Sequence, residues 1–133
     1  MTAYLFVALG GALGSAGRYW MTQSVDARLN ALLPDYAFPA GTLAVNVLGS
    51  FVIGLLAGME EGSRAGFGDS TRLFLMVGIC GGFTTFSSFS LQTLGLLREG
   101  LLLRAGGNIA LSVLLCLLAT WAGLALMQAL GRS

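Results

Sequence analysis

Long apolar segments alternate with short polar ones along the whole chain. The apolar segments cover about residues 4–21, 41–59, 73–97 and 108–130. Each is close to the roughly 20 residues that an α-helix needs to cross about 30 Å of hydrocarbon. Helices are expected rather than strands, because an open strand would leave unpaired backbone groups in lipid at several kcal/mol each. The pattern predicts an all-α membrane protein in which residues 1–133 form a single domain of four transmembrane helices.

The composition agrees with a membrane protein and argues against catalysis. Hydrophobic residues make up 56% of the chain and charged residues only 10%, too few to cover the surface of a small soluble domain. The chain has no His, the commonest proton shuttle and metal ligand, and no visible pairing of a nucleophile with a base. We therefore predict that the protein is not an enzyme. A net charge of +1 offers no basic face for nucleic acid.

The distribution of arginines leaves the orientation in the membrane open. Positively charged loops stay in the cytoplasm, so the side with more Arg residues should face inward. One side carries Arg64, Arg72 and Arg132, and the other carries Arg18, Arg28, Arg98 and Arg104. Three Arg residues against four do not decide the orientation, and two interpretations remain. The protein inserts in both orientations, which would allow an antiparallel dimer, or a weak bias is decided by the first helix. Arg18, near the end of the first segment, is expected to extend to the membrane interface.

Small residues recur at four-residue spacing in the first two segments. Gly10 and Gly14 form one such pair, and Ser50, Gly54 and Gly58 form a row in the second segment. Rows of this kind let helix backbones approach closely, which is the main way that transmembrane helices associate. They predict tight helix packing and carry no information about a substrate.

Two polar features of the segments admit a structural and a functional interpretation. Asn46 would be costly in hydrocarbon without a partner, so it either links two helices or offers its amide donors to a small anion. The last segment carries a polar stripe, each member four residues after the one before. Its members are Asn108, Ser112, Cys116 and Thr120. The stripe either packs against another helix or lines an aqueous path.

The centre of the third segment is the least helical part of any of the four. Residues 81–90 read GGFTTFSSFS, and Thr85 lies at the midpoint. Glycine costs about 1 kcal/mol relative to Ala in a helix, and Thr is β-branched, so we predict a break here. Free backbone carbonyls at membrane depth persist only where they line a cavity or bind an ion. Such oxygens suit a small alkali cation, and two antiparallel copies of the break would double their number.

Three phenylalanines follow this break at three-residue spacing. Phe83, Phe86 and Phe89 fall near one face, with Ser87, Ser88 and Ser90 between and after them. A row of Phe is ordinarily part of a helix-packing core. A phenyl ring is also electropositive at its edge, so rings set among hydroxyls could stabilise an anion.

Three motifs together resemble one family. The stretches GICGGFTTFSSFS in the third segment, GTLAVNVLGSF in the second and GGALGSAGRY in the first are similar to those of the Fluc (CrcB) family of bacterial fluoride channels. The resemblance covers essentially the whole chain, and the third-segment motif is the most specific. Ser88 stands where the family pattern has Thr, and it keeps the hydroxyl.

The resemblance implies a fold, a function and a set of site residues. It implies an antiparallel dual-topology homodimer with two pores, which exports fluoride passively across the bacterial plasma (inner) membrane and lowers cytoplasmic fluoride. A structural Na+ is expected at the dimer centre, held by the backbone carbonyls of Gly81 and Thr84. The anion pathway is expected to include Phe86, Phe89, Asn46 and Ser112. Phe83 is then a packing residue.

Two alternatives to a fluoride channel have less support from the sequence. A small dual-topology multidrug or guanidinium exporter depends on a membrane-embedded Glu in its first helix, and residues 4–21 contain no carboxylate. An accessory subunit of a larger complex would explain the glycine rows, but it would have no reason to break the third segment.

Overall fold

The computed structural model describes residues 1–33, 38–62 and 66–131, and the regular elements in this part of the chain are all helices, with no strand. Arg64 and Arg132 lie outside the described residues. The elements in chain order are α1 (Thr2–Leu32), α2 (Ala40–Gly62), α3 (Asp69–Arg72), the π-helix η1 (Leu73–Cys80), α4 (Gly81–Phe83), α5 (Phe86–Arg98) and α6 (Leu102–Leu130). The elements from α3 to α5 follow one another closely and are called the third segment below. The predicted all-α fold is confirmed.

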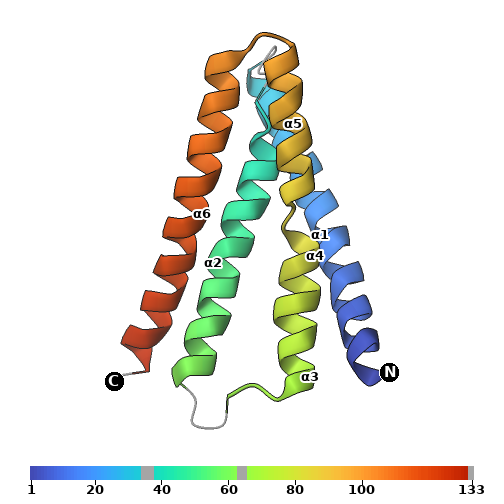
Figure 1. Ribbon diagram of the computed structural model, residues 1–133, viewed down its shortest axis with the longest axis vertical. Coiled ribbons are helices and arrows are strands. Elements are labelled where there is room, and N and C mark those ends of the chain that lie inside the picture. Colours follow the sequence, from blue (N-terminus) through green and yellow to red (C-terminus); the bar gives the residue numbers. More distant parts are fainter. Residues whose placement is uncertain (34–37, 63–65, 132–133) are drawn as a thin grey trace.

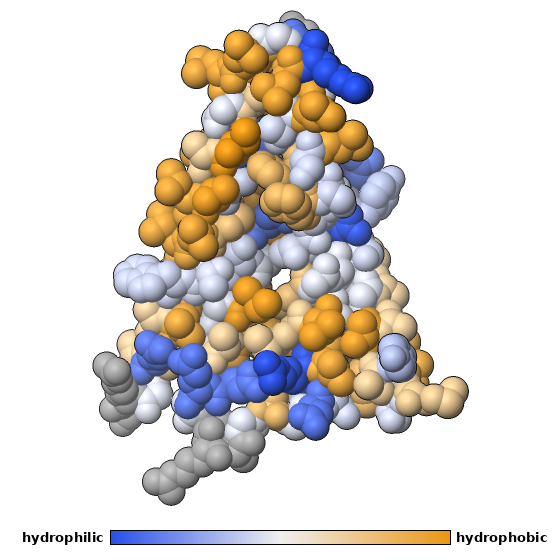
Figure 2. All heavy atoms as spheres, viewed as in Figure 1, coloured by the Kyte–Doolittle hydropathy of each residue, from blue (hydrophilic) through white to orange (hydrophobic). Residues whose placement is uncertain are grey.

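The helices lie roughly alongside one another, with α2 between α6 and the third segment (Figure 1). The start of α1 and the end of α6 lie at the same end of the molecule. Much of the face seen in Figure 2 is apolar, and strongly polar side chains gather at that end, with a further polar patch at the opposite end. Because apolar side chains cover the helices on the outside, the molecule has the surface of a protein surrounded by lipid.

Three helices of the described chain are long and apolar enough to cross a membrane. They are Ala40–Gly62, Asp69–Arg98 and Leu102–Leu130. Although α1 is long, it is not among them, because its glycines and charged side chains lower its mean hydropathy. The predicted second and third segments, 41–59 and 73–97, agree with the helices to within a few residues.

Two predicted boundaries are wrong. The first helix, expected at 4–21, continues to Leu32, since the polar residues after Met21 are tolerated in a helix and none is Gly or Pro. The Asp26 carboxylate in this extension accepts the Gly41 N–H at 2.8 Å, which ties it to the start of α2. The last helix begins at Leu102 rather than near 108, because its glycines are accommodated in the helix and the turn is made at Gly100 (φ 76°).

Facing glycines bring α1 against the third segment. A Cβ on Gly10 would collide with the Phe74 carbonyl oxygen and lie 2.9 Å from Gly78 Cα. A Cβ on Gly14 would lie 2.8 Å from the Phe83 nitrogen. The predicted role of the Gly10 and Gly14 pair in close packing is confirmed.

A second glycine row packs α2 on α6. A Cβ on Gly54 would collide with the Thr120 carbonyl oxygen, and a Cβ on Gly58 would lie 2.6 Å from Met127 Cβ. Gly123 of α6 faces back towards the Phe51 carbonyl of α2. Side-chain volume at any of these positions would push the two helices apart.

Replacing Gly14 with Ala is expected to lower the free energy of unfolding by about 1–3 kcal/mol, because the methyl group would overlap rigid backbone of the third segment. Gly11→Ala is the matched control, since a Cβ on Gly11 meets nothing within 4 Å. The measurement is thermal unfolding of both purified variants in detergent. Equal transition temperatures for the two variants would contradict the close contact at Gly14.

Candidate functional site

The third segment is broken where its residues are poorest for a helix. The α4 helix ends at Phe83, and Thr84 (φ −79°, ψ 155°) and Thr85 (φ −150°, ψ 112°) are extended. A new helix, α5, begins at Phe86 (Figure 1). The predicted break is confirmed. The π-helix η1 before it was not predicted, and nothing in LFLMVGIC distinguishes it from an ordinary apolar helix.

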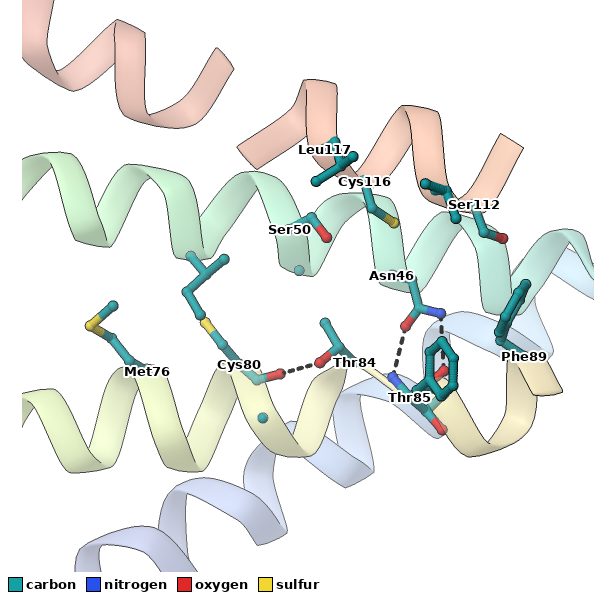
Figure 3. Close-up of a pocket in the computed structure, with 15 residues that line it drawn as sticks. Asn46, Ser50, Met76, Cys80, Thr84, Thr85, Phe89, Ser112, Cys116 and Leu117 are labelled. Atoms are coloured by element: carbon teal, nitrogen blue, oxygen red, sulfur yellow. Dashed lines mark hydrogen bonds between the residues drawn. The ribbon is translucent and has the colours of Figure 1, made fainter. Parts of the chain in front are cut away.

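The side chain of Asn46 on α2 holds the extended backbone of Thr85. Asn46 Oδ1 accepts the Thr85 N–H at 2.7 Å, and Asn46 Nδ2 donates to the Thr85 carbonyl at 3.0 Å (Figure 3). This pairing determines which end of the carboxamide is oxygen, because a backbone N–H needs an acceptor and a carbonyl needs a donor. Asn46 therefore links two elements, as one of its two interpretations expected.

The break changes the partners of several backbone groups. In a continuous α-helix the Thr85 N–H would donate to the Gly81 carbonyl, but here it donates to Asn46. The Ser88 N–H would donate to the Thr84 carbonyl, but it donates to the Thr85 hydroxyl at 3.2 Å, which caps α5. The carbonyls of Gly81 and Thr84 thus lose their regular helical donors.

The Gly82 carbonyl, in contrast, is bonded by α1. It accepts Arg18 Nε at 3.1 Å and Ser15 Oγ at 3.4 Å. The expectation that Arg18 extends to the membrane interface is wrong, because its guanidinium is directed to this carbonyl at the break. Arg18 therefore compensates one of the carbonyls that the break exposes.

A cavity of about 470 Å³ opens beside the break. It lies between α2, the third segment and α6, and a hollow is visible there near the middle of Figure 2. Several of the residues that line it are polar or were expected to take part in ion binding. They are Asn46, Ser50, Cys80, Gly81, Thr84, Thr85, Phe86, Phe89, Ser112 and Cys116. All four residues expected in the anion pathway line it, and so do the two residues expected to hold the cation.

The two phenylalanines at the cavity form a tilted pair. The ring centroids of Phe86 and Phe89 are 5.2 Å apart, and the rings are inclined at 46°. Phe86 is 79% exposed in the single chain, so most of its ring is not covered by the rest of that chain. Phe83 does not line the cavity, and its ring lies 3.2 Å from where a Cβ on Gly49 would stand. The expectation that Phe83 is a packing residue agrees with this position.

The polar stripe of α6 divides into two parts. Ser112 and Cys116 line the cavity, as the path interpretation expected. Thr120 donates instead to the carbonyl of Cys116 on its own helix, at 3.0 Å, and Asn108 bonds to Thr93 of α5 at 2.8 Å. Thr93 was not singled out in the sequence, and Ser50, which lines the cavity, was expected only to pack helices. The available signal for Thr93 was its position one helical turn after Phe89.

The apolar helices, the break and the cavity beside it define a small multi-pass membrane protein. The chain belongs to the family described as CrcB-like protein, Camphor Resistance (CrcB), whose family model matches residues 5–124. A fluoride-specific ion channel FluC of Methylocella silvestris is 54% identical over 122 residues, 90% of this chain and 88% of the relative. Proteins of the same name from Opitutus terrae (53% over 125 residues, 92% and 90%) and Rhodospirillum rubrum (49% over 121 residues, 90% and 90%) are also similar.

Proposed function

We propose that this protein is a fluoride channel that lets fluoride leave the bacterial cytoplasm passively across the plasma (inner) membrane. The observation that carries the proposal is the cavity at the helix break, where an amide, a hydroxyl and two phenyl rings meet. Its described lining contains no charged side chain of either sign, so no carboxylate repels an anion there. The names of the similar proteins support fluoride as that anion.

The proposed mechanism replaces the water around fluoride with donors on the wall. Asn46 Nδ2 has a second N–H beyond the one given to Thr85, and its direction is fixed by the bonds to the Thr85 backbone. Ser112 supplies a hydroxyl, and Phe86 and Phe89 supply electropositive ring edges. Donors that are already oriented need little rearrangement when the ion arrives. Chloride, which is larger, is excluded by the width of the path.

Passive conduction is favoured over coupled export. The chain has no His, and no carboxylate lies among the described residues of the cavity wall to carry a proton. The small multidrug or guanidinium exporter remains the second candidate, but it needs a Glu that the first helix lacks at membrane depth. The similar proteins are named as channels, so no enzymatic reaction is assigned.

We infer that α1 crosses the membrane as a fourth span. Its 31 residues give a length of about 46 Å, more than the hydrocarbon thickness. Large apolar side chains on it are exposed, namely Tyr4, Leu5, Leu9 and Leu13. Its close packing on the third segment supports insertion beside it.

An antiparallel homodimer of dual topology is proposed as the conducting form. The exposed apolar residues near the break include Val77, Phe86, Leu91 and Leu94. A second, inverted copy would cover such a face and close the open cavity into a path. The balanced Arg counts support insertion in both orientations. The accessory-subunit alternative predicts no stable homodimer after purification.

A Na+ ion at the dimer centre is proposed to join the two breaks. The carbonyls of Gly81 and Thr84 fit this role, because the donors that would occupy them in a helix are bonded to Asn46 and Thr85 instead. One chain offers two such oxygens, and two chains would offer four. When bound, the cation supplies positive charge that holds these carbonyls in place.

Fluoride release from liposomes containing the purified protein tests the proposed function. Fluoride should leave while chloride is retained. Retention of both ions by folded, dimeric protein would contradict the proposal and favour the exporter.

A further inference from the structure

A buried hydrogen-bond chain joins α6 to α5 beside the cavity. Asn108 of α6 is 1% exposed and Thr93 of α5 is 7% exposed. Asn108 Nδ2 donates to Thr93 Oγ1 at 2.8 Å, and Thr93 Oγ1 donates to the Phe89 carbonyl at 2.7 Å. The single hydroxyl hydrogen of Thr93 is used in its bond to Phe89, and its oxygen accepts Asn108. This chain of hydrogen bonds therefore links Asn108 on α6 to the backbone of Phe89, whose ring lies at the cavity.

The same carboxamide also contacts Ser112, which lies one turn further along α6. Ser112 Oγ donates to Asn108 Oδ1 at 3.5 Å, and Ser112 lines the cavity. At this distance the bond is weak, so the Ser112 hydroxyl can turn towards an ion at little cost. Asn108 and Thr93 do not line the cavity themselves. They can influence an ion in it only through the residues that they hold.

A buried Asn does something at this position that an apolar residue could not do, because its bond to Thr93 has a direction. A carboxamide removed from water costs free energy that its hydrogen bonds largely offset, whereas Leu would pack without that cost. The turn at Glu99–Leu101 already joins α5 and α6 at one end. Asn108 lies about 9 Å along α6 from the start of that helix, between the turn and Ser112. A directional link at this depth fixes how far α5 and α6 are shifted along each other.

We propose that Asn108 is a positioning residue for conduction. Through Thr93 it joins α6, which carries Ser112, to the part of α5 that carries Phe89, so one buried side chain sets the separation of two walls of the pathway. The inference rests on the proposed function. It goes beyond that function by giving Asn108 a mechanical role without contact with the ion.

The experiment compares single-channel fluoride currents in planar bilayers. Asn108→Leu and Thr93→Val remove the link at either end while nearly keeping the volume. Each is expected to lower the unit current about fivefold, and the double variant should be no worse than the more affected single one, because both changes break the same chain. Thr93→Ser keeps the hydroxyl and should conduct like the wild type.

Thr120→Val is the matched control. It also removes a Thr hydroxyl bonded to the carbonyl four residues before it, but no second side chain in the described part of the chain bonds to that hydroxyl. A wild-type unit current is expected. If Asn108→Leu or Thr93→Val gave fewer channels with an unchanged unit current, the role would be structural only and the inference would be overturned. An absence of fluoride current in the wild type would instead overturn the proposed function.

Discussion

Replacing Asn46 with Asp is expected to reduce fluoride conduction by about a hundredfold or more. A carboxylate would place a negative charge beside the path, and two like charges about 4 Å apart repel by about 4 kcal/mol at an effective dielectric constant of about 20. The new side chain could still accept the Thr85 N–H, but it could not donate to the Thr85 carbonyl, which Asn46 does at 3.0 Å. The added charge and the lost hydrogen bond should both lower fluoride conduction.

The measurement is the initial rate of fluoride release from liposomes holding equal amounts of dimeric protein. Asn30→Asp is the matched control, because it makes the same chemical change on an exposed residue of α1 outside this cavity. Its rate should stay within about twofold of the wild type, since an exposed charge is screened by salt. Undiminished conduction by Asn46→Asp would remove Asn46 from the anion pathway.

Replacing Phe86 with Ile is expected to lower the fluoride rate by about tenfold or more while the dimer persists. Ile fills much of the same apolar volume, but it has no electropositive ring edge and cannot form the tilted pair with Phe89. Release rates and size-exclusion profiles of the purified variant would be measured together.

Phe51→Ile serves as the control for loss of a ring. Phe51 lies on α2 against a separate apolar groove, and it does not line the cavity at the break. Its variant should keep the wild-type rate. A wild-type rate for Phe86→Ile as well would leave the ring edges without a role in conduction.

Local chemistry predicted the break and marked some residues of the cavity wall as candidates. Gly81, Gly82, Thr84 and Thr85 are each poor in a helix, so their clustering alone indicates an interruption. Asn46 and the polar stripe of α6 could be marked as candidates because a polar side chain at membrane depth needs a partner or a path. The family resemblance then assigned Asn46, Ser112 and the two phenylalanines to the anion pathway. These signals are carried by single residues in a known environment, and the structure brings the residues together around one cavity.

Long-range partners could not be predicted in this way. The bond from Arg18 to the Gly82 carbonyl depends on α1 lying against the third segment, and the bond from Asn108 to Thr93 depends on the shift between α5 and α6. Periodicity gives the face of each residue, but it does not give the relative height of two helices. For the same reason the stripe on α6 was expected to act as one unit, although only Ser112 and Cys116 reach the cavity.

The end of α1 was mispredicted for a different reason. The apolar window closes near Met21, but the helix continues to Leu32 because polar residues are compatible with an α-helix outside the hydrocarbon. Hydropathy measures contact with lipid rather than helical conformation. A hydropathy window therefore gives too early an end for a helix whose last residues are polar.

The most direct test of the central claim is release of fluoride and chloride from the same liposomes. Liposomes containing the purified protein are loaded with both potassium salts, valinomycin is added, and two ion-selective electrodes follow the external concentrations. We predict rapid release of fluoride while chloride stays inside until detergent is added. Release of both ions at similar rates, or of neither by folded dimeric protein, would contradict a fluoride-selective path at the break in the third segment.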